Sequence, residues 1–124
     1  MTATVLVVED DQSISALIHR MLLREGHQVL EAADGAMALE ILQAISCDLV
    51  ITNVLMPKLS GIEFVEQLHS LQPQMPIILM TGYPAVSGTT MVDRVVEVLA
   101  KPFDLNMLRS TVRRLLTTNL HPST

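Results

Sequence analysis

Aromatic side chains and cysteine are scarce in this chain of 124 residues. It has no tryptophan, one tyrosine and two phenylalanines, so its core must be built from aliphatic residues and methionine. The single cysteine, Cys47, excludes an internal disulfide and favours a reducing compartment. No apolar run approaches the length of a membrane span, and residues 1–20 lack a signal-peptide pattern. We therefore predict a cytoplasmic protein without a membrane segment.

Basic residues are also fewer than acidic ones. The chain has 13 Asp and Glu residues against 8 Lys and Arg residues, which gives a formal net charge of −5. This balance argues against a general nucleic-acid surface. The four histidines lack the spacing of metal ligands. Arg109, Arg113 and Arg114 gather near the C-terminus, where they form either a solvated helix face or a surface for a dimer or another partner.

Short apolar runs alternate with segments of helical periodicity along the chain. The length fits one domain, and 49% of the residues are hydrophobic, which is enough for a buried core. Residues 117–124 are expected to form a frayed polar tail. The apolar runs predict five strands, at Thr4–Val8, Gln28–Ala32, Asp48–Thr52, Ile77–Thr81 and Val95–Ala100.

Capping signals mark helices between these strands. Asp11 and Asp104 are predicted N-caps, and Gly26 is the expected stop of the first helix. Ser60 and Glu63 have the spacing of a capping box. The first helix is expected to bury its periodic apolar residues, which are Ile14, Leu17, Ile18, Met21 and Leu22.

Strands that alternate with helices pair in parallel through right-handed crossovers, so we predict an α/β fold with a doubly wound sheet and helices on both faces. Ligands bind beyond the carboxyl ends of such strands. The residues at those ends are Glu9, Asp10, Asn53, Thr81 and Lys101. The sequence therefore predicts that two carboxylates, an amide, a hydroxyl and an ammonium group meet at one edge of the sheet.

These groups suit the chemistry of a metal ion and a phosphoryl group. The paired carboxylates of Glu9 and Asp10 are hard oxygen ligands for Mg²⁺, and an amide oxygen or a backbone carbonyl could add to them. The hydroxyl of Thr81 and the ammonium group of Lys101 could hold phosphoryl oxygens. A solvated acidic loop and an exposed lysine are the alternative interpretation of the same residues.

Four motifs at the strand ends resemble those of the receiver (CheY-like) domain of the two-component response-regulator family. They are the run Glu9-Asp10-Asp11, the loop Met56-Pro57 to Gly61, Thr81, and Lys101-Pro102-Phe103. The resemblance covers residues 4–116, as a single domain within residues 1–124. It implies a flavodoxin-like fold with five parallel strands in the order 2-1-3-4-5.

The resemblance also implies roles for individual residues. Glu9, Asp10, Asn53 and the backbone carbonyl of Leu55 would hold Mg²⁺. Thr81 and Lys101 would contact a phosphoryl group. A histidine kinase or phosphotransfer protein would be the partner, and an output or dimer partner would bind the face of the fourth helix, fifth strand and last helix.

Asn53 is the largest departure from the family pattern, because it stands where the family carries its phosphate-accepting aspartate. An amide is a far poorer nucleophile than a carboxylate, so phosphorylation should fail, and the lost charge should weaken Mg²⁺ binding. Val98 stands where many receivers place an aromatic residue. The segment Tyr83–Arg94 is shorter than usual and contains poor helix formers, so the fourth helix is expected to be short, shifted or partly irregular.

Asn53 is consistent with a natural pseudo-receiver, an engineered block on phosphorylation, or a sequence error. The predicted function is a phosphorelay signalling module that acts by protein–protein contact and is not an enzyme. The alternatives are a scaffold or dimerisation module of a hybrid histidine kinase, and, further away, a Mg²⁺-dependent phosphotransfer enzyme. A flavin-binding domain is disfavoured, because acidic residues follow the first strand where a phosphate loop would lie.

Overall fold

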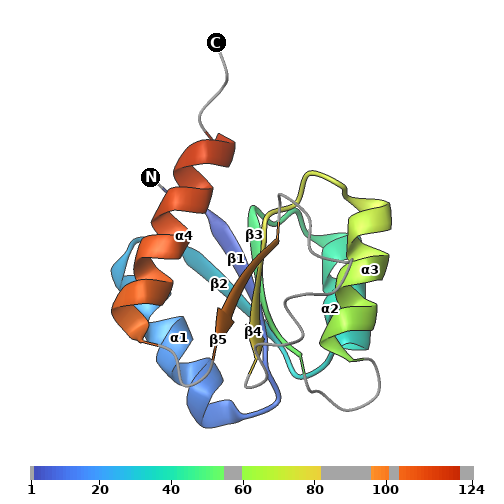
Figure 1. Cartoon of the computed structure of the whole chain (residues 1–124), viewed down its shortest axis with the longest axis horizontal. Helices are drawn as coiled ribbons and strands as arrows, with labels where there is room; N and C mark the ends of the chain where they lie inside the picture. The colour runs from blue at the N-terminus through green and yellow to red at the C-terminus, as the bar shows by residue number, and fades with distance from the viewer. Residues whose placement is uncertain (1, 55–59, 82–95, 101–103, 121–124) are drawn as a thin grey trace.

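The computed structural model describes residues 2–54, 60–81, 96–100 and 104–120. Strands and helices alternate through most of this part of the chain (Figure 1). Among the described residues, two helices precede the third strand and two follow it. The elements are β1 (Thr4–Val8), α1 (Gln12–Arg24), β2 (Gln28–Ala32), α2 (Gly35–Ala44), β3 (Leu49–Asn53), α3 (Gly61–Leu71), β4 (Ile77–Thr81), β5 (Val96–Ala100) and α4 (Leu105–Leu120).

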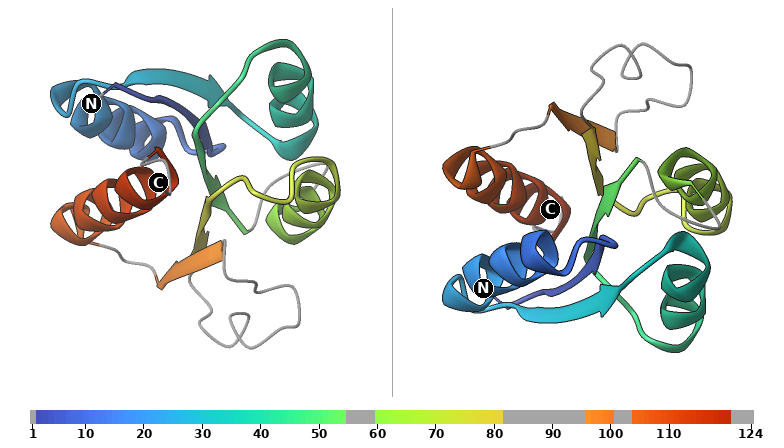
Figure 2. Two further views of the ribbon diagram at one scale, coloured as in Figure 1. Left: turned by 90° about the horizontal axis from the view of Figure 1, so that it is seen from above. Right: turned by 90° about the horizontal axis from the view of Figure 1, so that it is seen from below.

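The five strands form one parallel sheet in the order β2-β1-β3-β4-β5, as predicted. Helices α1 and α4 cover one face of the sheet, and α2 and α3 cover the other (Figure 2). The predicted doubly wound α/β fold is therefore confirmed. Because the order reverses after β1, the carboxyl ends of β1 and β3 lie side by side at the switch point, where such sheets bind ligands.

Each face of the sheet contributes to a separate apolar cluster. In β1, Val5 and Val7 pack with α1 and α4, whereas Leu6 and Val8 pack with α2 and α3. This alternation explains why the strand is a continuous apolar run, since helices cover both of its faces. Phe64 is the one aromatic residue in the described core, and aliphatic residues and methionine fill the remainder.

The predicted helix ends are confirmed. The side chain of Asp11 accepts hydrogen bonds from the backbone N–H groups of Ser13 and Ile14 at 2.9 and 3.3 Å. Gly26 follows α1 with φ +89°, a left-handed conformation that favours glycine. Ser60 and Glu63 form both hydrogen bonds of a capping box.

Several boundaries and faces differ from the sequence prediction. The third strand runs from Leu49 to Asn53, so Asp48 lies before it and its side chain accepts the N–H of Thr4 at 2.9 Å. Helix α4 continues to Leu120, so residues 117–120 are helical and the predicted polar tail was wrong there. Leu17 was predicted to be buried but is 44% exposed. The predicted fourth helix lies outside the described residues.

Candidate functional site

Three of the residues predicted from the strand ends meet at the carboxyl edge of the sheet. Glu9 directly follows β1, Asn53 ends β3 and Thr81 ends β4. The strands bring them together because β3 pairs with both β1 and β4. All three are buried, with exposed fractions of 4%, 8% and 1% respectively, whereas Asp10 is exposed. The predicted site residues Lys101 and Leu55 lie outside the described part of the chain.

A hydrogen bond joins Glu9 to Asn53 across the two strands. The Nδ2 group of Asn53 donates to Oε2 of Glu9 at 3.2 Å, and the same oxygen accepts the backbone N–H of Asp11 at 3.0 Å. The Oδ1 atom of Asn53 accepts the backbone N–H of Val54 at 2.9 Å. The amide thus connects the carboxylate after β1 to the backbone after β3.

These two partners determine which way the Asn53 amide faces. If the amide were flipped, its oxygen would face the carboxylate of Glu9, and its NH₂ group would face the N–H of Val54. The first contact would place two acceptors together and the second would place two donors together. Asn53 therefore presents its nitrogen, and not its oxygen, to Glu9.

The side chains of Glu9, Asp10 and Asn53 suit Mg²⁺ only in part. Carboxylate oxygens such as those of Glu9 and Asp10 are suitable ligands for this ion. The amide of Asn53 turns a hydrogen-bond donor toward Glu9, so a cation shared by the two residues would require the amide to rotate away from both of its partners. Within the described ranges, no three Asp, Glu, His or Cys side chains are close enough to hold a metal ion together.

Gly61 fixes the backbone beside Asn53, a role that the sequence analysis did not assign. Its N–H donates to the carbonyl of Val54 at 2.7 Å, which links the start of α3 to the end of β3. A Cβ atom at this position would lie 2.0 Å from the backbone oxygen of Asn53. Only glycine permits this approach, and its place in the loop motif was the signal for it.

Val98 and Glu31 lie on the two edge strands of the sheet, β5 and β2. Val98, half-buried in β5 opposite Leu79, packs with the cluster under α2 and α3. Glu31 and the acidic pair line a shallow pocket of about 180 Å³ beside β2. Glu31 also contacts His19, and sequence reasoning missed it because it lies inside a strand. The pocket is acidic, so it suits a cation better than a phosphate.

Residues 5–113 match the response regulator receiver domain. The chain is 30% identical to sporulation initiation phosphotransferase F of Bacillus subtilis, over 94% of this chain and 95% of that protein. It is 34% identical to the sensor kinase CckA of Brucella abortus over 93% of this chain. The signal receiver domain of a histidine kinase from Syntrophus aciditrophicus superposes with a TM-score of 0.88 at 26% identity, covering 98% of this chain and 94% of that domain. The chain belongs to the response regulator receiver domain family.

Some of these relatives are much longer than the chain. It spans 13% of the length of CckA and 26% of the transcriptional regulator NtrC of Azospirillum brasilense. Receiver domains thus occur both as most of a protein and as a small part of one. In the part of the chain that the structure describes, no helix is long and apolar enough to cross a membrane.

Proposed function

We infer that this chain is a two-component receiver module that signals by protein–protein contact while aspartyl phosphorylation is blocked at residue 53. The observation that carries this proposal is the position of Asn53. It is buried at the carboxyl end of β3, next to Glu9, where the family pattern places the phosphate-accepting aspartate. The module would be a pseudo-receiver, either natural or engineered.

The chemistry of the Asn53 amide supports the proposed block on phosphorylation. A receiver carboxylate attacks the phosphorus atom of a donor and forms an acyl phosphate. The nitrogen lone pair of an amide is delocalised and its oxygen is uncharged, so Asn53 is a poor nucleophile. Its oxygen also accepts the N–H of Val54 and its nitrogen donates to Glu9, so the side chain has the wrong chemistry and is held by two partners. We therefore propose no enzymatic activity for the module.

Mg²⁺ would bind weakly. The carboxylates of Glu9 and Asp10, the carbonyl of Leu55 and the amide of Asn53 would hold the ion, which in a receiver offsets negative charge during phosphoryl transfer. Here the amide contributes no charge and must break its hydrogen bond to Glu9 before its oxygen can reach a shared ion. Thr81 and Lys101 would remain as the residues that contact a phosphoryl group.

The partners would be those of a two-component system. A histidine kinase or a phosphotransfer protein would bind the module in the cytoplasm, and an output or dimer partner would bind the face of residues 83–94, β5 and α4. The similarity to a segment of the sensor kinase CckA favours a second candidate, a scaffold or dimerisation module of a hybrid kinase. A phosphotransfer enzyme has less support, because Leu55 stands where a second acid would be needed.

Phosphorylation with a small donor tests this proposal. The purified chain is incubated with acetyl phosphate and Mg²⁺ and analysed by intact mass spectrometry. We expect no stable gain of one phosphoryl group, whereas Asn53→Asp should gain one and Asn53→Ala should not. A phosphoryl group on the unaltered chain would contradict the block. Failure of Asn53→Asp to accept phosphate would mean that the site has lost more than its acceptor.

A further inference from the structure

A groove of about 350 Å³ lies at the amino edge of the sheet, between the loops that lead into β3 and β4. These loops are neighbours because β3 and β4 pair, with Val50 opposite Ile77. Both loops lie at the edge of the sheet away from the arrowheads of the strands (Figure 1). Strand β3 is five residues long and ends at Asn53, so about 13 Å of strand separates the groove from the candidate site.

The floor of the groove is apolar and continues the core. Met75 and Pro76 are buried there, and Cys47 is half-buried. Met75 belongs to the cluster under α2 and α3, and Cys47 packs against that cluster. Burial and the neighbouring carboxylate of Asp48 raise the pKa of the Cys47 thiol, so the thiol is uncharged at neutral pH. The floor can therefore receive an apolar side chain.

Polar side chains form the rim of the groove. They are Asp48, Gln72 and Gln74. The Oδ2 atom of Asp48 accepts the backbone N–H of Thr4 at 2.9 Å, which fixes the carboxylate in place. The described residues give its Oδ1 atom no hydrogen bond. This oxygen is therefore available to a donor from another molecule.

The loop between α3 and β4 has a fixed shape. The carbonyl of Gln72 accepts the N–H of Met75 at 3.1 Å, which closes a turn. The carbonyl of Pro76 accepts the N–H of Val50 at 3.1 Å and ties the loop to β3. Pro73 and Pro76 restrict the backbone further, because their rings fix φ. A groove with rigid walls loses little entropy when a ligand binds.

Two exposed apolar side chains extend this surface beyond the groove. Ile45, which follows α2, is 44% exposed, and Leu71, the last residue of α3, is 64% exposed. Ile45 lies two residues before Cys47, and Leu71 directly precedes Gln72, so each lies next to the lining of the groove. Leu71 is the most exposed large hydrophobic residue in the described part of the chain.

This side of the protein is acidic. Lys58 is the only lysine or arginine between Glu25 and Asp93. Helices α2 and α3 contain three glutamates and no lysine or arginine. A ligand of the groove gains from positive charge, because it meets Asp48 at the rim and an acidic surface around it.

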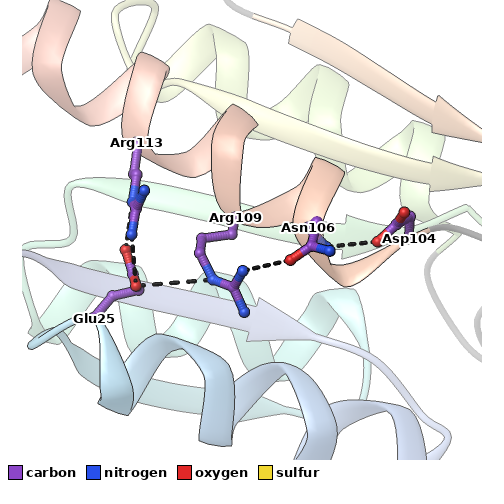
Figure 3. Close-up of polar contacts among 5 residues, drawn as sticks. All are labelled: Glu25, Asp104, Asn106, Arg109 and Arg113. Carbon is purple, nitrogen blue, oxygen red and sulfur yellow. Dashed lines mark hydrogen bonds and ion pairs between the residues drawn. The ribbon is translucent and has the colours of Figure 1, made fainter.

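The arginines of the chain lie mainly on the other face of the sheet, where several are already paired. Helices α1 and α4, which cover that face, contain five arginines and no acidic residue (Figure 2). Glu25 accepts hydrogen bonds from Arg113 at 2.6 and 3.0 Å, and its carboxylate lies 3.8 Å from Arg109 (Figure 3). Glu97 pairs with Arg114 at 3.1 Å. A second copy of the chain is therefore a poor source of cations for the groove.

We propose that the groove between the loops at residues 45–48 and 72–76 binds a short segment of a partner protein that carries apolar side chains followed by lysine or arginine. An apolar side chain contacts the floor at Met75 and Pro76, and the cation pairs with Asp48 at the rim. The volume of the groove suits one or two side chains and is too small for a whole helix.

The place of the groove separates this docking from the candidate site. A partner bound at the amino edge of the sheet leaves the carboxyl edge, where Asn53 lies, open to a second protein. The docking therefore does not depend on the chemistry of residue 53. A nucleic acid does not suit the groove, because the acidic surface repels phosphates.

Binding of a defined peptide to the whole chain tests the proposal. The probe is the short peptide glycine-leucine-leucine-lysine-lysine-glycine with blocked ends. One counterpart has glutamate in place of each lysine, and another has serine in place of each leucine. We expect the probe to bind at least about fivefold more tightly than either counterpart, and its binding to weaken as salt is raised. Titration of the ¹⁵N-labelled chain measures the affinity, and amide shifts should change at residues 45–48 and 71–76.

Matched variants separate docking in the groove from general charge attraction. Asp48→Asn removes the charge at the rim but keeps an oxygen that can accept the N–H of Thr4, and it should weaken binding about fivefold. Glu40→Gln removes the same charge from the exposed surface of α2 and should change binding less than about twofold. Gln74→Lys places a like charge on the rim and should also weaken binding. Gln43→Lys makes the same change on exposed α2 and should not.

Five results would overturn the proposal. They are no shifts at millimolar probe, equal binding of the glutamate counterpart, equal losses in the matched variants, shifts confined to α1 and α4, and self-association of the chain through residues 45–48 and 71–76. Analytical ultracentrifugation tests the last of these. Circular dichroism of each variant verifies that the fold is retained. Because every variant keeps Asn53, failure of these experiments leaves the phosphorylation test unaffected.

Discussion

Changing Asn53 to aspartate should make the stability of this protein depend on Mg²⁺. The substitution changes little in shape, but it removes the donor that faces Glu9 and puts a second carboxylate in its place. In the native arrangement the two side chains approach to 3.2 Å in a buried setting. Without a cation, the variant therefore places two negative charges where the wild-type chain has a hydrogen bond.

The expected size of the effect follows from this distance. Two unit charges 3.2 Å apart repel by about 5 kcal/mol at an effective dielectric constant of about 20. The lost hydrogen bond adds about 1 kcal/mol. Side-chain rotation, or uptake of a proton by one carboxyl group, relieves part of this repulsion. We therefore expect the variant to lose about 2–3 kcal/mol of unfolding free energy in the absence of divalent ions.

Urea denaturation in EDTA and in increasing Mg²⁺ measures the effect. An ion that binds only the folded variant stabilises it by about 2.7 kcal/mol at a hundred times its dissociation constant, so most of the loss should be regained. The wild-type chain should gain much less. Asp48→Asn, at the opposite edge of the sheet, is the control and should respond to Mg²⁺ like the wild type. Equal stability of Asn53→Asp and wild type in EDTA would refute the reasoning.

Three further predictions concern single residues. Gly61→Ala should cost about 1–3 kcal/mol in urea denaturation, since its Cβ would meet the backbone oxygen of Asn53, and an unchanged midpoint would contradict the close approach. Asp11→Ala should cost about 1 kcal/mol through loss of the N-cap of α1, and the helical signal in circular dichroism should fall earlier on heating. Burial lowers the pKa of His27, whose Nδ1 accepts the N–H of Ala3 at 3.1 Å. The unfolded chain therefore binds more protons than the folded one near and below pH about 6.5, so stability should fall as the pH drops through that value. The replacement His27→Gln should flatten this slope, and an unchanged slope would assign it to other groups.

The fold could be predicted from the sequence because its signals are local. Most of the strands are short apolar runs, and helix ends are marked by Asp11, Ser60 with Glu63, and Gly26. The errors lie where a local signal competes with tertiary contacts. Residues 117–119 are polar, yet they continue α4, which ends at Leu120. Leu17 has the spacing of a core residue, but it is 44% exposed and lines a pocket between α1 and α4.

The candidate site was only partly predictable. Its members could be named from the strand ends, since all carboxyl ends of a parallel sheet face one way. The direction of the Asn53 amide could not be predicted. It depends on Glu9, which lies 44 residues earlier, and on the N–H of Val54. The role of Gly61 likewise depends on a contact between the ends of β3 and α3.

The sequence by itself determined that the chain alternates strands with helices, and that an asparagine, Asn53, stands at the end of the third strand. Periodicity, capping and residue identity are properties of the chain alone. Only the tertiary structure decided that Asn53 donates to Glu9, and that α1 and α4 place their arginines on one face of an acidic protein. These facts depend on the strand order and the crossovers, because they arise from groups that are distant in sequence and neighbours only in the folded sheet.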